Sequence, residues 1–246
     1  MCTLVAAHRL FTDAPLVIAA NRDERLDRPS RRPFLWPGPV PFFAPRDELA
    51  GGSWLGLNAN GLFVGITNRF GPDLPGTRRS RGLLVTDTLG QDNARTARAM
   101  LGSLDARTYS PFNLFYADDT DAFVCWSDGE RLEHLVLAPG LHVLTERSFR
   151  GVAPARETTV RQRWKATQTD PAKPKLVRLQ AMLGEHRPED PLASPCVHLP
   201  DWSYGTRSAC ILTVGMQGRD DVFLWSEGPP CRVPFSSLAP LPFMRA

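Results

Sequence analysis

The first two dozen residues constrain the fold of this 246-residue chain more than any other stretch. Two apolar runs, in residues 1–8 and 16–20, flank a polar break at residues 11–15. Apolar runs joined by a short turn-forming segment are typical of an antiparallel β-hairpin. Such a hairpin places Asn21, Arg22 and Asp23, after the second strand, beside Cys2 at the start of the first. A cationic amino terminus, a thiol and a carboxylate would then share one end of a sheet.

The position of Cys2 has a chemical consequence. Methionine aminopeptidase removes an initiator methionine readily when the next side chain is small, so we expect the mature chain to begin at Cys2. The pKa of an α-amine is about 7.7–8.0 and that of a thiol about 8.5, so the amine can accept the thiol proton near neutral pH. Two structural alternatives remain open from the residues alone, namely a buried inert cysteine and an ordinary solvated turn at residues 21–24.

An ordered set of motifs continues from this hairpin over nearly the whole chain. It comprises Met-Cys-Thr at 1–3, Asn-Arg-Asp-Glu at 21–24, Arg-Pro at 28–29, Gly-Gly-Ser-Trp-Leu-Gly at 51–56, Asn68, Arg-Gly at 81–82 and Tyr-Gly-Thr-Arg-Ser at 204–208. With these motifs the chain resembles the NRDE family, also called the transport and Golgi organisation protein 2 family. The resemblance implies an N-terminal nucleophile hydrolase fold in one domain, residues 1–246. That fold is α+β, a four-layer αββα sandwich of two antiparallel sheets between helical layers.

The resemblance also implies roles for individual residues. The nearest enzyme relatives of the family are choloylglycine and penicillin V acylases, in which the N-terminal cysteine attacks an amide carbonyl. Cys2 would be the nucleophile and Asn68 the oxyanion donor, whereas Asp23 and Arg207, with Asn21 and Arg22 beside them, would orient the amine and the thiolate. An arginine next to a thiol favours the thiolate and lowers its pKa. The alternatives are a turn-capping role for Asn68 and a surface charge for Arg207.

Two departures from the acylase pattern leave the function open. Ala20 stands where those enzymes have an arginine. After the strand that ends at Thr145, those enzymes have a second asparagine, whereas this chain has Glu146 and Arg147. Losing one oxyanion donor costs about 10²–10³ in turnover. The first hypothesis is therefore a hydrolase of a non-peptide carbon–nitrogen bond. The second is a non-catalytic carrier or chaperone of haem or another hydrophobic ligand, because some family members are linked to haem handling. A scaffold without either role is the third.

Composition limits the partners and the compartment. A net charge of +3, with basic clusters that lack interleaved aromatic residues, argues against a nucleic-acid partner, and no apolar run is long enough to span a membrane. Five widely spaced cysteines without a C-x-x-C pair argue against a disulfide framework and a zinc ribbon. Cys196 and His198 are the closest cysteine–histidine pair, and their spacing alone does not indicate a site. We therefore expect a cytoplasmic protein with a small-molecule substrate or hydrophobic ligand, no cofactor and no metal.

The rest of the chain predicts the following elements. The proline-rich residues 28–45 are expected to be neither helix interior nor central strand, and Asn60-Gly61 predicts a hairpin that leads to Asn68. Residues 81–104 have helical patterning with Asp92 as N-cap. Four strands at 112–117, 122–126, 132–137 and 141–145 predict a meander, and residues 148–173 lack clear periodicity and predict loop and short helix. A helix at 175–185 and a hairpin of 206–216 with 222–225, turning at 217–220, complete the chain.

Overall fold

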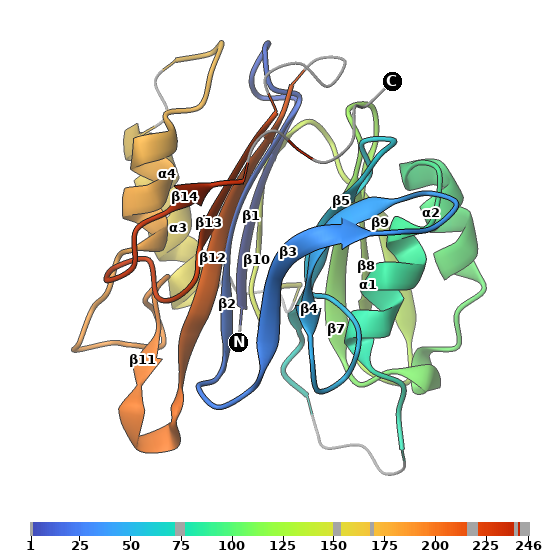
Figure 1. Ribbon diagram of the computed structural model, residues 1–246, viewed down its shortest axis with the longest axis horizontal. Coiled ribbons are helices and arrows are strands. Elements are labelled where there is room, and N and C mark those ends of the chain that lie inside the picture. Colours follow the sequence, from blue (N-terminus) through green and yellow to red (C-terminus); the bar gives the residue numbers. More distant parts are fainter. Residues whose placement is uncertain are drawn as a thin grey trace. The chain divides into compact units, whose positions relative to one another are not determined.

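The computed structural model describes residues 2–71, 77–149, 154–167, 170–215, 221–238 and 241. The chain divides into two compact units, each built on its own sheet (Figure 1). The first unit comprises Met1–Arg28 and Gly140–Leu241, and the second comprises Pro29–Pro139 and Pro242–Ala246. Organisation as a single domain stays a prediction. None of the described helices combines the length and the apolar character that crossing a membrane requires.

The N-terminal hairpin lies in the middle of the first unit's sheet. This antiparallel sheet has the order β10 (Gly140–Leu144), β1 (Cys2–His8), β2 (Leu16–Arg25), β12 (Tyr204–Val214), β13 (Val222–Ser226) and β14 (Ser236–Ser237), with β11 (His198–Leu199) also on β12. In the β1–β2 register Cys2 lies opposite Arg22. The predicted hairpin and its placement of Cys2 are confirmed. The final hairpin is also confirmed by the pairing of β12 with β13, whereas its turn at 217–220 lies outside the described residues.

Helices α3 (Ala155–Thr167) and α4 (Leu176–Leu183) pack against one face of this sheet (Figure 1). Val5 and Ala7 of β1, Val17 and Ala19 of β2, and Ala209 and Ile211 of β12 form a buried core with apolar residues of these helices. The predicted helix at 175–185 is confirmed, and residues 148–173, predicted as loop and short helix, contain the 13-residue helix α3. The buried stripe of α3 runs through Arg156, Val160 and Trp164, four residues apart. An arginine in the first of these positions hides the helical period from the sequence.

The second unit's sheet is antiparallel and follows chain order. Its strands are β3 (Ser30–Trp36), β4 (Phe42–Asp47), β5 (Leu55–Asn58), β6 (Phe63–Asn68), β7 (Phe112–Ala117), β8 (Ala122–Ser127) and β9 (Leu132–Val136). Helices α1 (Arg81–Leu89) and α2 (Ala94–Gly102) contact this sheet. The short 3₁₀ helix η1 (Ala106–Thr108) also belongs to the second unit, whereas η2 (Pro200–Trp202) belongs to the first. The α2 N-cap is Asn93, which forms a capping box with Thr96, so the prediction of Asp92 is wrong by one residue. The α+β class is confirmed.

Two strand predictions need correction. Residues 28–45 contribute to two strands, and β4 is an inner strand although it contains Pro45. Proline is accommodated because β5 pairs with β4 only at Phe42 and Phe43, so the ladder has already ended on that side. The predicted four-stranded meander is wrong in its last member. Strands β7, β8 and β9 are consecutive neighbours, but β10 pairs with β1 in the first unit's sheet.

Two of the family motifs meet at a close backbone contact in the second unit. The amide of Ser53 donates to the carbonyl of Gly82 at 3.0 Å, and a Cβ added to Gly52 would lie 2.1 Å from the Gly82 carbonyl carbon. We expect Gly52→Ala to lower the free energy of unfolding by about 1–3 kcal/mol or more, because backbone atoms cannot yield as a flexible side chain can. Urea unfolding of the purified variant measures this loss.

The matched control for this substitution is Gly102→Ala, since a Cβ at Gly102 meets nothing within 4 Å. It should leave stability unchanged or raise it by up to about 1 kcal/mol, because alanine reduces the conformational entropy of the unfolded chain. Equal effects of the two substitutions would show that the contact of Gly52 with Gly82 is not tight in solution.

Candidate active site

The Cys2 thiol lies at the start of β1, beside a buried cation. Cys2 and Arg22 are directly opposed on neighbouring strands, and opposed side chains share one face of a sheet. Cys2 is partly buried, whereas Arg22 is buried and lies 3.7 Å from Glu24 as an ion pair. The thiol donates to the main-chain oxygen of Asp23 at an Sγ–O distance of 3.9 Å. Burial raises the pKa of the Cys2 thiol above that of an ordinary cysteine, and Arg22 opposes this shift in part.

The side chains of Asn21 and Asp23 lie on the other face of the sheet. Successive side chains of a strand alternate between faces, and the neighbouring odd-numbered residues of β2 pack against α3 and α4. The Asn21 amide donates to the main-chain oxygens of Leu183 at 2.9 Å and Pro195 at 2.8 Å. Asn21 therefore anchors the end of α4 and the following loop to the sheet, and this position separates it from the thiol.

The Asp23 carboxylate is buried, at 2% exposure, between two donors. Its Oδ2 accepts from Arg156 Nη1 at 3.1 Å, and its Oδ1 accepts from the Thr206 hydroxyl at 2.7 Å. Burial raises the pKa of Asp23 to about 6, against the opposing effect of the Arg156 guanidinium. The carboxylate is therefore held in a fixed orientation, and its charge changes close to neutral pH.

A second carboxylate shares the same arginine. Glu146 Oε2 lies 3.9 Å from Arg156 Nη1, and the Glu146 side chain is 14% exposed, whereas that of Arg147 is 52% exposed. Arg156 also donates through Nε to the main-chain oxygen of Leu192 at 3.0 Å. Glu146 Oε1 also lies 3.9 Å from Arg147 Nε, so Arg156 is the buried cation that the two carboxylates share. Sequence reasoning missed Arg156 because it lies in the stretch without helical periodicity and far from every motif.

Arg207 lies at a bulge of β12 and lines a cavity. The register between β12 and β2 shifts between Thr206 and Ser208, which leaves Arg207 as the extra residue. Its Nη2 donates to the main-chain oxygen of Arg28 at 3.4 Å. Tyr204, Thr206 and Arg207 line a cavity of about 230 Å³ in the first unit. Because the Tyr204 hydroxyl donates to the main-chain oxygen of Asp23 at 2.8 Å, the cavity adjoins the Asp23 site.

The structure brings together five of the six predicted site residues at one end of the first unit's sheet. Cys2 and Arg22 share one face, Asn21 and Asp23 lie on the other, and Arg207 is on the neighbouring strand. Asn68 lies in the second unit, at the end of β6 opposite Phe112, with a partly exposed side chain. Its role as an oxyanion donor, like the other assigned roles, stays a prediction.

Comparison with known sequences gives a consistent result. The family model described as Transport and Golgi organisation 2 matches residues 1–223. The Transport and Golgi organization protein 2 homolog of Bos taurus is 30% identical over 232 residues, which cover 82% of this chain and 83% of the relative.

Solved structures with low sequence identity share the fold. A Caenorhabditis elegans N-acylethanolamine-hydrolyzing acid amidase ortholog matches with a TM-score of 0.57 and 14% identity, over 87% of this chain and 94% of that chain. A variant of the conjugated bile acid hydrolase from Clostridium perfringens matches with a TM-score of 0.62 and 12% identity, over 96% and 92% of the two chains. These similarities confirm the predicted N-terminal nucleophile hydrolase fold.

Proposed function

The chain belongs to the Transport and Golgi organisation 2 family, and from that premise we propose that it is an N-terminal-cysteine hydrolase of a non-peptide carbon–nitrogen bond. The observation that carries this proposal is the position of the Cys2 thiol opposite the buried Arg22, at the end of the sheet that also holds Asp23. The names of the structural neighbours suggest a first panel of test substrates, namely N-acylethanolamines and conjugated bile acids.

In the proposed reaction Met1 is first removed, so that Cys2 carries a free α-amine. The amine takes the thiol proton, and the thiolate forms a bond to the carbonyl carbon of the amide. The oxyanion of the tetrahedral intermediate needs a hydrogen-bond donor, and Asn68 stays the residue that the family resemblance predicts for this role. The carbon–nitrogen bond then breaks as the leaving amine receives the proton from the α-ammonium. Water hydrolyses the resulting thioester, which releases the acid and restores the Cys2 thiol.

The charges around Asp23 support a cationic amino terminus at Cys2. Arg156 carries one positive charge, whereas the two carboxylates that contact it, Asp23 and Glu146, carry two negative charges when ionised. Buried charges are stable only when they are compensated. Arg147, 3.9 Å from Glu146, offsets one of these charges from an exposed position, and an α-ammonium at the start of β1 would add a further positive charge near the buried Asp23. Arg22, rather than Arg207, would then favour the thiolate, because Arg22 is the cation directly opposite Cys2.

Removal of Met1 should change the reactivity of the Cys2 thiol. In a chain with an N-terminal extension the pKa of the Cys2 thiol is raised. The rate of its alkylation should therefore keep rising, about tenfold per pH unit, at pH values above the pKa of an ordinary cysteine. In the mature chain the adjacent α-ammonium lowers the thiol pKa, so labelling near pH 7 should be at least about tenfold faster. Iodoacetamide labelling across pH 6–10, followed by intact mass and peptide mapping, measures both rates.

Cys125 and Cys210 are the internal references for this experiment, because both are buried and burial raises the pKa of each to about 12. They should stay unlabelled in both forms of the chain. A mature chain that retains Met1, or a Cys2 that labels no faster after maturation, would leave no base for the proposed reaction.

A second candidate, a carrier of haem or another hydrophobic ligand, is favoured by one feature of the second unit. The rings of Phe34, Trp36 and Phe42 form a stack on β3 and β4, with centroids 5.1 and 5.3 Å apart. Arg31 and Arg46 lie over Phe34 and Trp36, respectively. Phe34 and Trp36 are partly exposed, whereas Phe42 is buried, and partly exposed rings beside guanidinium groups suit a flat apolar ligand that carries acidic groups.

A further inference from the structure

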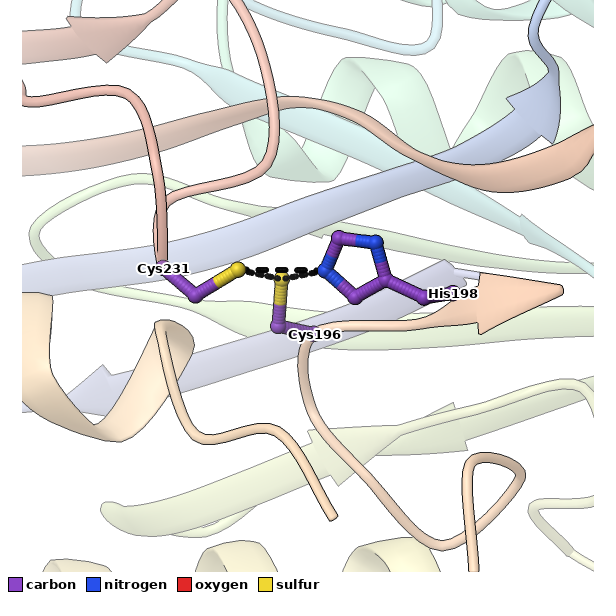
Figure 2. A group of neighbouring side chains, drawn as sticks. All are labelled: Cys196, His198 and Cys231. Carbon is purple, nitrogen blue, oxygen red and sulfur yellow. Dashed lines mark hydrogen bonds between the residues drawn. The ribbon is translucent and has the colours of Figure 1, made fainter. Parts of the chain in front are cut away.

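Three side chains with metal-binding atoms converge in the first unit. Figure 2 shows the sulfurs of Cys196 and Cys231 and the imidazole of His198 pointing toward one another. The Cys196 sulfur lies 3.6 Å from His198 Nε2 and 3.5 Å from the Cys231 sulfur. The distance between His198 Nε2 and the Cys231 sulfur is 3.1 Å.

Backbone pairing holds two of these side chains in place. His198 begins β11 and pairs with Gly205 of β12, while the amide of Val197 donates to the Thr206 hydroxyl at 2.8 Å. The amide of Cys196 donates to the main-chain oxygen of Glu185 at 3.0 Å. Cys231 comes from the segment between β13 and β14 and is exposed. The cluster therefore joins two segments that are distant in the sequence.

Two of the three distances match the edges of a tetrahedral metal site. With zinc–sulfur bonds of about 2.3 Å and zinc–nitrogen bonds of about 2.0–2.1 Å, tetrahedral geometry separates two sulfurs by about 3.8 Å and a sulfur from a nitrogen by about 3.6 Å. Two of the observed separations, 3.5 and 3.6 Å, are within 0.3 Å of these values, and the third is shorter. A disulfide would require about 2.0 Å between the sulfurs, and both cysteines are free.

A second histidine lies beside the cluster. The ring of His186 lies edge-on to that of His198 at a centroid distance of 4.5 Å. His186 Nδ1 is also 3.3 Å from the main-chain oxygen of Cys196. His186 therefore packs against the imidazole of His198 and contacts the backbone of Cys196.

We propose that Cys196, His198 and Cys231 bind a thiolate-preferring metal ion, Zn²⁺, with the fourth coordination position left to water or a bound ligand. Two thiolates and one imidazole are a donor set that suits zinc. His198 also lines the cavity that Arg207 lines. Residues 197–200, from the segment of Cys196, and Gly228, Pro229 and Arg232, from the segment of Cys231, contribute to its wall. The ion would tie the two segments together and hold the cavity in shape. This inference is independent of the proposed hydrolase function.

Titration of the reduced protein with Zn²⁺ against a chromophoric chelator tests the proposal. We expect one ion per chain, and Co²⁺ in its place should give the visible absorption of a tetrahedral site with a sulfur-to-cobalt charge-transfer band. Cys231→Ser, at an exposed position that should leave folding unaffected, is expected to weaken zinc binding at least about a hundredfold, since even outer-shell changes cost 10–100-fold. Cys2→Ser removes a cysteine outside the cluster and should bind zinc as the unmodified chain does.

Three results would overturn the proposal. One is the absence of metal uptake by the reduced protein, and another is unchanged zinc affinity in Cys231→Ser. The third is a protein that isolates with a Cys196–Cys231 disulfide, seen as a mass gain on reduction, and takes up no metal afterwards.

Discussion

Cys2→Ala should abolish amide hydrolysis, with turnover reduced by about 10⁴–10⁶, the loss typical when an enzyme's nucleophile is removed. The reason is chemical, because alanine offers neither the sulfur that attacks the carbonyl nor the proton that the α-amine accepts. Product formation from the N-acylethanolamine and conjugated bile acid panel, followed by mass spectrometry, measures the effect. The substitution is at a partly buried position at the start of β1, so the fold should survive.

A matched control separates the thiol from the amine. A chain with a cleavable N-terminal extension retains the Cys2 thiol but has no α-amine on that residue, and it should be inactive until a protease exposes Cys2. Turnover by Cys2→Ala equal to that of the unmodified chain would refute the hydrolase. If the unmodified chain hydrolyses nothing, while haem binds saturably to both it and Cys2→Ala, the carrier becomes the better proposal.

Arg156→Met should be the most destabilising substitution in the first unit's site, by about 3–5 kcal/mol. The Arg156 side chain is only 2% exposed, and its loss leaves the buried Asp23 carboxylate without its cation. Methionine fills a similar volume, so the cost reports mainly the uncompensated charge. Urea unfolding measures it, and a double-mutant cycle with Asp23→Asn isolates the coupling between the two residues.

Arg163→Met is the control on the same helix. Arg163 is 53% exposed and pairs with Glu185, and exposed ion pairs contribute only about 0–1 kcal/mol. Equal losses in the free energy of unfolding for Arg163→Met and Arg156→Met would show that burial of the Arg156–Asp23 pair does not increase the cost of removing its cation.

The cost of Arg156→Met should also depend on pH. In the folded chain the pKa of Asp23 is raised to about 6, whereas the unfolded value is about 3.9. A raised pKa gives stability that is present below the unfolded value and is lost as pH rises through the folded value. Without Arg156 the folded pKa of Asp23 rises further, so the variant continues to lose stability above pH 6. Its deficit should therefore be larger near pH 8 than near pH 5, and a constant deficit would contradict this account.

Patterns within one stretch of chain were sufficient to predict much of the fold. The two apolar runs at residues 1–8 and 16–20, on either side of the polar break at 11–15, predicted the hairpin that places Cys2 opposite Arg22. Asn60-Gly61 predicted the turn between β5 and β6, where Gly61 has a φ of +88°. The ordered motifs, from Cys2 to Ser208, predicted the hydrolase fold. Each of these features depends on local hydrophobic period, turn chemistry or motif order, all of which are visible without tertiary contacts.

Only the tertiary structure decided the contacts between distant segments. Arg156 meets Asp23 across 133 residues of sequence, from a helix whose buried stripe includes that arginine. Strand β10 leaves the meander because its partner is β1, at the start of the chain. Cys231 reaches His198 across 33 residues, so no spacing motif marks the three-residue cluster. In each case the second partner of a contact comes from a distant part of the sequence. Local sequence patterns predict the elements, but they do not indicate which distant residues the folded chain brings together.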